Sequence, residues 1–298
     1  MTYKIKTGHV GHKPYFMAYK HYVPNNETAG DAVMVLVGGG GHRMKVWEIT
    51  PDGRPGWAPS LAEKGREVIT VEWACNSPEI YCCSAKELCR LTQKENMDLI
   101  KRVIEKEVPR ARKIIFLGWS MGGPQVFKLA CDIVPRRSAA ILGYATTGPL
   151  NFFKPTAESN QRPVDLEKPF TFSQNTIDIL CNSQLFPKKH IKDYIKNYLT
   201  PISPAMVAIQ AKHPAFKNYW RWLTVKNTRN IPPVFLVNGT YDPGHRPAKE
   251  SVFINWLKRF QNDATLKYIK GFTHLGMISY GNRKAVRLYL DWLKGRGL

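Results

Sequence analysis

The chain has 298 residues, a hydrophobic fraction of 43% and a formal charge of +21, from 44 basic and 23 acidic side chains. No run of eighteen apolar residues occurs and the first eight residues lack the apolar core of a secretion signal, so we expect a cytoplasmic protein with no membrane partner. The charge fits either an anionic ligand or a solvated surface, and both remain open; without a nucleic-acid-binding motif we expect no nucleic-acid partner.

Strands and helices alternate along most of the chain. Residues 3–7 and 14–23 predict an antiparallel strand pair with a turn near 8–13. Apolar runs predict further strands over 32–37, 67–73, 114–117, 138–145, 233–238 and 264–270. Helical spacing or composition predicts helices over 58–64, 84–107, 124–133, 253–260 and 286–293, and residues 48–57 have the composition of a loop.

This alternation predicts an α/β fold, with a mostly parallel central sheet covered by helices on both faces. It stops between 148 and 230, where Ile191, Tyr194 and Tyr198 lie on one side of a predicted helix. We therefore expect a core made of 1–147 and 231–298, with 148–230 inserted as a helical cap. Four aromatic residues of this segment form either the core of the cap or a substrate pocket: Phe152, Phe153, Trp220 and Trp222.

The apolar run 114–117 ends in Gly118-Trp119-Ser120-Met121-Gly122-Gly123, and a helical pattern follows. A Gly-x-Ser-x-Gly turn between a strand and a helix raises the middle serine above the sheet in a strained conformation. Ser120 is therefore the predicted nucleophile. The alternative is a glycine-rich turn without chemistry, and Trp119 is either a substrate contact or a packing residue.

A serine hydroxyl needs a base and an orienting carboxylate, and a parallel sheet supplies them from strand C-termini on one edge. Strand 233–238 leads to Asp242 and strand 264–270 leads to His274, which gives the chain order Ser, Asp, His of an α/β-hydrolase. His245 is the rival base. Asp242 precedes Pro243, so an Asx turn is the alternative to a catalytic role.

The glycines after strand 32–37 predict one half of an oxyanion hole. Met121 N–H and Gly40 N–H are the expected donors, with Gly39 as the alternative to Gly40 and as a substrate contact. A phosphate-binding loop is disfavoured, because 38–41 lacks the Gly-Lys-Ser/Thr ending. His42 is assigned either to the mouth of the site or to the surface.

Six cysteines occur, at 75, 82, 83, 89, 131 and 181. The Cys-x-x-Cys spacing of structural zinc sites is absent, so no metal is expected. We expect free, buried or partly buried thiols. A vicinal disulfide or a redox role is the alternative.

The Ser120 turn, the glycines, Asp242 and His274 resemble the α/β-hydrolase superfamily over the whole chain apart from the cap. Residues 38–47, followed by Glu48-Ile-Thr-Pro-Asp-Gly-Arg-Pro-Gly-Trp57, resemble more narrowly the bacterial esterases of the esterase 713-like subgroup. The subgroup has His-Gly at 38–39 and an Asp with a Gly-Arg-rich turn at 72–77. Some members carry the acid as a glutamate near 143–147, where this chain has no carboxylate, and this favours Asp242.

Together these features predict a serine hydrolase that cleaves a small-molecule carboxylic ester or lactone without a cofactor. Cleavage of a carbon–carbon, thioester or amide bond, or a lyase step, would use the same site. A non-catalytic binding protein for an anionic ligand is the remaining alternative. The sequence leaves a monomer and a homodimer open.

Overall fold

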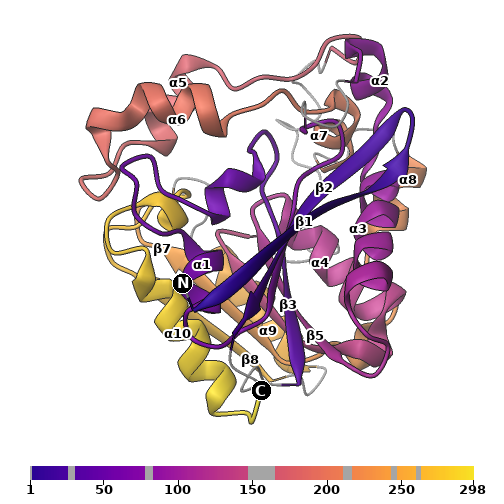
Figure 1. The fold of residues 1–298 in the computed structure, drawn as a ribbon, viewed down its shortest axis with the longest axis vertical. Helices are drawn as coiled ribbons and strands as arrows, with labels where there is room; N and C mark the ends of the chain where they lie inside the picture. Colours follow the sequence, from indigo (N-terminus) through magenta and orange to yellow (C-terminus); the bar gives the residue numbers. More distant parts are fainter. Residues whose placement is uncertain are drawn as a thin grey trace.

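The computed structural model describes residues 2–25, 31–77, 83–146, 165–210, 217–242, 247–259 and 263–298 (Figure 1). Its strands form one eight-stranded sheet in the order β1-β2-β4-β3-β5-β6-β7-β8. β1 and β2 pair antiparallel, β2 and β4 pair antiparallel, and every other neighbouring pair is parallel. The strands are β1 (Tyr3–His12), β2 (Tyr15–Pro24), β3 (Ala32–Val37), β4 (Val68–Val71), β5 (Lys113–Trp119), β6 (Ser138–Tyr144), β7 (Val234–Gly239) and β8 (Ala264–Ile269).

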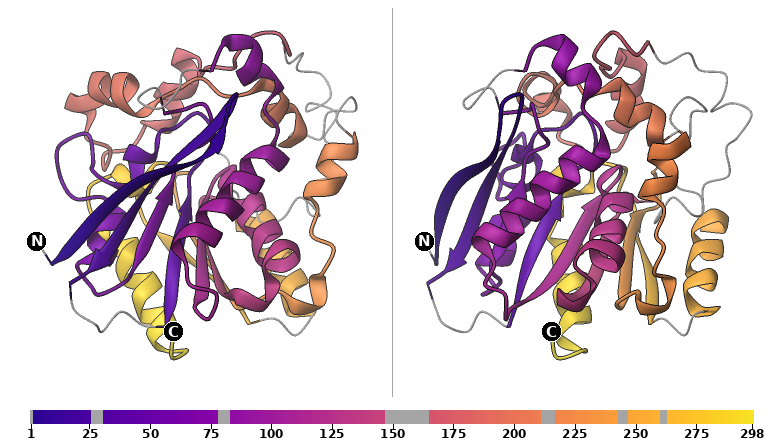
Figure 2. Two further views of the ribbon diagram at one scale, coloured as in Figure 1. Left: turned by 45° about the vertical axis from the view of Figure 1, so that its right-hand side comes forward. Right: turned by 90° about the vertical axis from the view of Figure 1, so that its right-hand side faces the viewer.

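Helices cover both faces of this sheet, and Figure 2 shows the sheet between them. The helices are α1 (Trp57–Ala62), α2 (Ala85–Arg90), α3 (Gln93–Glu107), α4 (Gly122–Lys128), α5 (Gln174–Leu180), α6 (Ile191–Tyr198), α7 (Pro204–Gln210), α8 (Lys217–Leu223), α9 (Pro247–Arg259) and α10 (Arg283–Lys294). Short 3₁₀ helices lie at Met44–Trp47, Pro135–Arg137, Lys188–His190, Thr228–Asn230 and Gly276–Ile278, and Leu129–Ile133 is a π-helix.

Alternate side chains of the central strands enter two separate cores. In β3, Val33, Val35 and Val37 pack into the core that contains α3, α4 and α9, while Met34 and Leu36 pack into the core of α1 and α10. All six residues of β3 are buried. This explains why the strand is a continuous apolar run in the sequence. The predicted doubly covered sheet is confirmed.

Two predicted elements are wrong in detail. The N-terminal turn is not near 8–13, because the pairing continues to His12 opposite Tyr15 and the chain reverses at 13–14. The helix predicted over 84–107 is two helices, α2 and α3. Each begins with a capping box, Ser84 with Glu87 and Thr92 with Glu95, which satisfies free backbone N–H groups at a new helix start.

Between β6 and β7 the described residues form α5 to α8. The segment from Tyr198 to Ile202 lies against the loop that follows β3: Arg43 N donates to Tyr198 O at 2.8 Å and Thr200 N donates to Gly41 O at 3.0 Å. Figure 1 shows α5 and α6 together at one end of the molecule. The separate cap over 148–230 stays a prediction, and Phe152 and Phe153 lie outside the described residues. No helix of the described ranges has the length and apolarity needed to cross a membrane.

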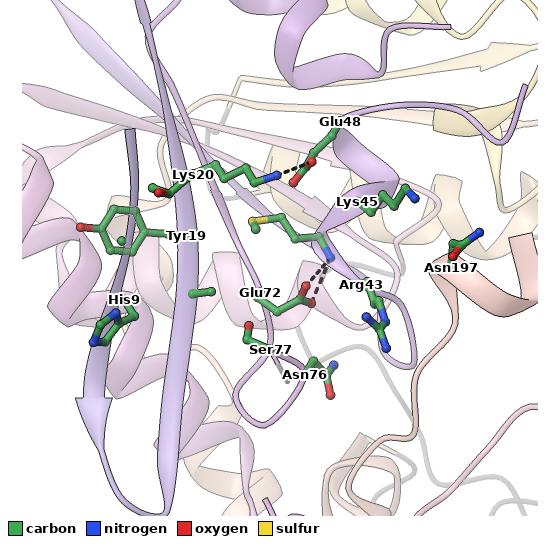
Figure 3. Close-up of a pocket in the computed structure, with 14 residues that line it drawn as sticks. His9, Tyr19, Lys20, Arg43, Lys45, Glu48, Glu72, Asn76, Ser77 and Asn197 are labelled. Atoms are coloured by element: carbon green, nitrogen blue, oxygen red, sulfur yellow. Dashed lines mark hydrogen bonds and ion pairs between the residues drawn. The ribbon is translucent and has the colours of Figure 1, made fainter. Parts of the chain in front are cut away.

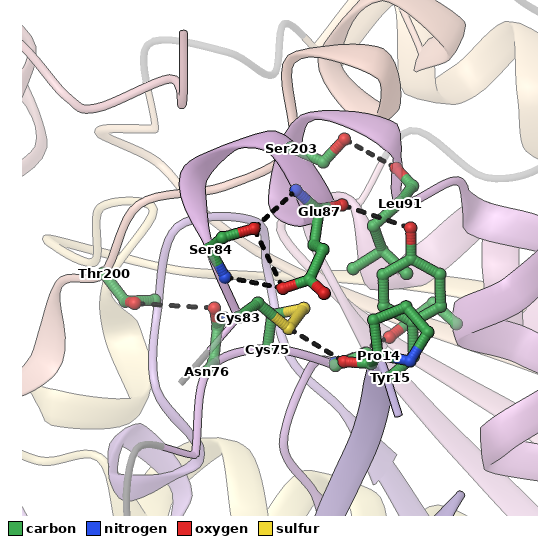
Figure 4. Close-up of a disulfide and its surroundings, with 12 residues drawn as sticks. Pro14, Tyr15, Cys75, Asn76, Cys83, Ser84, Glu87, Leu91, Thr200 and Ser203 are labelled. Atoms are coloured by element: carbon green, nitrogen blue, oxygen red, sulfur yellow. Dashed lines mark hydrogen bonds between the residues drawn. A yellow bond between two sulfur atoms is a disulfide. The ribbon is translucent and has the colours of Figure 1, made fainter. Parts of the chain in front are cut away.

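The expectation of free thiols is wrong for two cysteines. Cys75 and Cys83 form a disulfide with a Cα–Cα distance of 5.3 Å (Figure 4). The positive φ of 68° at Cys75 turns the chain after β4, and the start of α2 brings Cys83 opposite it. Cys89, Cys131 and Cys181 are free and buried, as expected. The side chain of Cys82 lies outside the described residues.

A buried charge network holds the β1–β2 hairpin on the core. His21 bonds to Glu67 Oε1 through Nε2 at 2.7 Å and to Glu107 Oε2 through Nδ1 at 3.0 Å. The ring therefore lies between two carboxyl groups and contacts one through each of its nitrogens. Tyr19 donates to Glu107 and Arg112 pairs with Glu67, so that β2, α3 and the approaches to β4 and β5 are joined at one point.

Removing the ring would leave the buried Glu67 carboxylate and the partly buried Glu107 carboxylate without their shared partner. We expect His21→Ala to lower the free energy of unfolding by about 3–5 kcal/mol. Urea denaturation measures the loss. Lys101→Ala, which removes an exposed pair with Glu105 on α3, is the control and should change stability by less than about 0.5 kcal/mol. Equal effects of the two substitutions would contradict this role for the network.

Candidate active site

Ser120 lies in the turn between β5 and α4 with a strained backbone. Its φ is 51°, in the left-handed region, which costs a residue other than glycine about 1–3 kcal/mol. Two hydrogen bonds hold the turn: Ser120 N donates to Tyr144 O at 3.2 Å, and Gly123 N donates to Ser120 O at 3.0 Å. The serine is partly exposed while the six residues before it are buried. The predicted geometry of the turn is therefore present.

The loop after β3 reaches this turn because it consists of glycines. A Cβ on Gly39 would lie 3.1 Å from Ser120 Cβ, and a Cβ on Gly40 would lie 2.5 Å from Ile202 Cδ1 and overlap Met121. Gly40 is buried, yet its N–H has no acceptor among the described residues. Buried N–H groups without a partner are rare in proteins, so this N–H is available to a ligand beside Ser120.

The loops after β7 and β8 meet at Asp242 and His274. Asp242 Oδ2 lies 2.9 Å from His274 Nδ1, and the aspartate side chain is fully buried while 15% of the histidine side chain is exposed. Because a carboxylate accepts, the ring donates through Nδ1 and presents Nε2 away from Asp242. Residue 245, the rival base, lies outside the described residues.

His274 reaches the Ser120 turn through Trp119. Their ring centroids are 5.7 Å apart, and Trp119 Nε1 donates to His274 O at 2.9 Å. Within the described part of the chain, the Ser120 hydroxyl is not hydrogen-bonded to the His274 ring. The structure thus joins Asp242 to His274 directly and His274 to the residue before the serine.

Comparison with known proteins decides the fold. No family model matches the sequence, and no curated protein matches it. Solved structures do: a soluble variant of monoglyceride lipase from Saccharomyces cerevisiae is 15% identical, with a TM-score of 0.67 over 99% of this chain and 97% of that chain. The peroxisomal alpha-beta-hydrolase Lpx1 of the same yeast is 14% identical, with a TM-score of 0.60 over 98% and 89%. The chain has the α/β-hydrolase fold.

Haloalkane dehalogenase DbeA from Bradyrhizobium elkani has the same TM-score to this chain as the lipase, 0.67. It is 11% identical, and 98% of both chains is covered. A lipase and a dehalogenase on one fold show that the fold alone does not fix the reaction. The function of this chain therefore has to be inferred from its own site residues.

In this α/β-hydrolase fold His42 is a buried wall beside the Ser120 turn, so the alternative of a surface position is wrong. It is 3% exposed and packs edge-on against Trp119 at 4.5 Å. Nδ1 donates to Gly40 O at 3.0 Å and Nε2 accepts from Tyr194 OH at 2.7 Å. Burial lowers the pKa of His42 to about 3, so the ring is neutral and fixes the Gly40 loop against α6.

Trp119 is fully buried between the rings of His42, Trp47 and His274, which places it behind the serine as packing. A substrate contact through Trp119 or Gly39 stays a prediction. The sequence alone did not reveal the Tyr194–His42 bond, because the two residues are 152 positions apart.

The 48–57 loop, on which the narrower resemblance depends, braces the loop that carries His274. Arg54 Nη1 donates to Ser279 O at 3.2 Å, and Trp57 Nε1 donates to Asn282 O at 3.0 Å. Asn282 returns a bond from Nδ2 to Pro55 O at 3.1 Å. These contacts hold the segment that follows His274, whereas the bond to Asp242 holds the His274 ring itself.

Glu72 anchors the far end of the Gly40 loop. Met44 N lies 2.9 Å from both of its carboxyl oxygens, and the side chain is buried. Burial raises the pKa of Glu72 to about 8, so the group is mostly protonated at neutral pH. Sequence reasoning noted residue 72 only as a departure from the esterase 713-like pattern and missed this role.

The raised pKa predicts a dependence of stability on pH. The unfolded carboxyl ionises near 4.5, whereas the folded one keeps its proton up to about 8. The contribution of Glu72 to stability is therefore full below pH 4.5 and is lost as pH rises to 8, by at most about 1.4 kcal/mol per pH unit. Glu72→Gln cannot titrate, so its stability relative to the unsubstituted protein should rise over this range in urea titrations. A constant difference between pH 5 and pH 8 would contradict it.

Proposed function

We propose that the chain is a serine hydrolase that cleaves a small-molecule carboxylic ester or lactone through an acyl-enzyme on Ser120. The observation that carries the proposal is the buried bond of 2.9 Å between Asp242 and His274, on a loop that packs against the neighbour of a strained, partly exposed serine. Strain at a polar side chain beside a histidine–carboxylate pair is typical of an activated nucleophile.

In the proposed reaction Ser120 Oγ attacks the carbonyl carbon and His274 Nε2 takes the hydroxyl proton. Asp242 holds the tautomer with the proton on Nδ1 and stabilises the imidazolium. The carbonyl oxygen becomes an oxyanion, bound by the N–H groups of Gly40 and Met121. His274 returns the proton to the leaving alkoxide. Water, deprotonated by the same ring, then releases the acid and restores Ser120.

In the proposed mechanism the hydrogen bond between Ser120 Oγ and His274 Nε2 forms when the substrate binds. Catalytic hydrogen bonds are often long without substrate and shorten in the Michaelis complex. The similarity to a monoglyceride lipase supports an ester as the bond class. Lactone cleavage, the small-molecule partner, the homodimer and the cytoplasmic location stay predictions. A disulfide is more typical of an oxidising compartment than of the cytoplasm.

Replacing the nucleophile tests the proposal directly. We expect Ser120→Ala to lose a factor on the order of 10⁴ or more in turnover of an activated ester, because no other group can form the acyl-enzyme. Ser138→Ala is the control, since Ser138 starts β6 and its hydroxyl donates to Val134 O, away from the Ser120 turn. A fluorophosphonate should label the unsubstituted protein and not Ser120→Ala. Unchanged turnover in Ser120→Ala would refute the proposal.

A substrate panel separates the proposed bond from the alternatives. Esters, lactones, thioesters, amides and β-diketones are compared by kcat/KM, and hydrolysis of esters or lactones above the others is expected. A preference for carbon–carbon, thioester or amide cleavage would keep the site and replace the bond class. Absence of turnover on every member would favour a binding protein.

The orienting role of Asp242 predicts that its substitution lowers turnover without unfolding the protein. Asp242→Asn removes the carboxylate that fixes the His274 tautomer, so kcat should fall by about 10²–10⁴. KM should change little, because the Asp242 side chain is fully buried and bonded to the His274 ring. Asp98→Asn, in an exposed pair with Lys94, is the matched control. Equal kcat for the two variants would assign Asp242 to the structure of the turn alone.

A further inference from the structure

A cavity of about 730 Å³ lies between the β1–β2 hairpin and the loops that follow β3 and β4 (Figure 3). Its volume falls within the range of about 300–1,000 Å³ that is usual for small-molecule sites. Lys20 contributes from the hairpin, Arg43 and Lys45 from the loop after β3, and Glu72 and Asn76 from the loop after β4.

This cavity is separate from the proposed active site. Its lining contains none of Ser120, Asp242 and His274. The loop after β3 divides the two sites: Gly39 and Gly40 contact the serine turn, whereas Arg43 lines the cavity. A ligand of this cavity would therefore bind independently of the proposed chemistry at Ser120.

The cavity holds positive charge that the protein does not neutralise. Lys20 is paired with Glu48 at 2.6 Å. Among the described residues, neither Arg43 nor Lys45 has a carboxylate within ion-pair distance, and Lys45 Nζ lies 5.3 Å above the ring of Tyr198. Arg43 and Lys45 therefore both line the cavity without an ion pair among the described residues, and Glu72 is the acid whose pKa the charge of Arg43 influences.

Arg43 carries an unsatisfied donor. Its Nε is buried and has no hydrogen-bond acceptor in the structure. A buried donor without an acceptor costs about 1–3 kcal/mol, and more when the group is charged. Guanidinium groups bind carboxylates and phosphates with two parallel hydrogen bonds, so an oxyanion in the cavity matches the charge of Arg43. Nε has no exposed surface and pairs with such an anion only after the side chain turns.

The one fully enclosed acid of the cavity does not oppose an anion at neutral pH. Glu72 accepts from Met44 N with both oxygens, and burial raises its pKa to about 8. Its neutral form adds an O–H donor to the lining. Figure 3 shows Glu72, Arg43 and Asn76 gathered on one side of the cavity and the Lys20–Glu48 pair on the other.

We propose that this cavity binds a small molecule with a carboxylate or phosphate group, and that Arg43 and Lys45 hold the oxyanion. Asn76, which accepts from Thr200 Oγ1 at 3.5 Å, lies on the same wall with its amide group. The net charge of +21 raises the local concentration of such anions.

Calorimetric titration with sodium citrate and with sodium phosphate, at pH 7 and constant ionic strength, tests the site and separates the two kinds of oxyanion. Binding of at least one anion with a stoichiometry of one is expected. Arg43→Gln should weaken it at least tenfold and Lys45→Gln about threefold to tenfold, because each removes one charge-assisted contact. Arg287→Gln, on the exposed face of α10, is the matched control and should bind as the unsubstituted protein does.

Protein labelled on Ser120 with a fluorophosphonate, if it labels, should bind the anion unchanged. No binding of either anion would overturn the proposal. Equal weakening by Arg43→Gln and Arg287→Gln would overturn it as well, since that result means attraction to the whole surface. Lys45→Gln keeps the test valid if circular dichroism shows that Arg43→Gln is misfolded.

Discussion

The site depends on how closely two backbones approach each other. The loop after β3 and the turn after β5 come together so tightly that a Cβ on Gly122 would lie 2.4 Å from Val37 O and one on Gly39 would lie 3.1 Å from Ser120 Cβ. Only glycine allows this contact. It places the Gly40 N–H, which has no acceptor among the described residues, beside the serine. His42 and Tyr194 hold the loop from α6, and Tyr144 O holds the turn from β6.

The sequence predicted the centre of the sheet well because the central strands are buried on both faces. β3, β5 and β7 are continuous apolar runs, and each ends at a candidate site residue or glycine loop. The meeting of Asp242 and His274 followed from the rule that parallel strands carry their loops to one edge. Their catalytic roles remain predictions, because neither the fold nor a distance of 2.9 Å measures turnover.

Other features could not be derived from spacing. The Tyr194–His42 bond and the His21 network each join residues far apart in sequence, so only the folded chain reveals them. The break between α2 and α3 was readable, since Ser84-x-x-Glu87 and Thr92-x-x-Glu95 are both capping boxes. Apolar periodicity alone did not reveal this break between the two helices. The disulfide was missed because cysteine spacing gives no information on the left-handed turn at Cys75.

That disulfide joins two cysteines only eight positions apart, directly beside Asn76 and Ser77 in the wall of the cavity in Figure 3. A short loop loses less chain entropy on cross-linking than a long one, and this bond also ties the residue before Asn76 to the residue before Ser84, the N-cap of α2. Molecules produced in a reducing host and in an oxidising one would share a sequence but differ in this covalent bond. The choice of expression compartment therefore decides which chemical form of the cavity wall is purified.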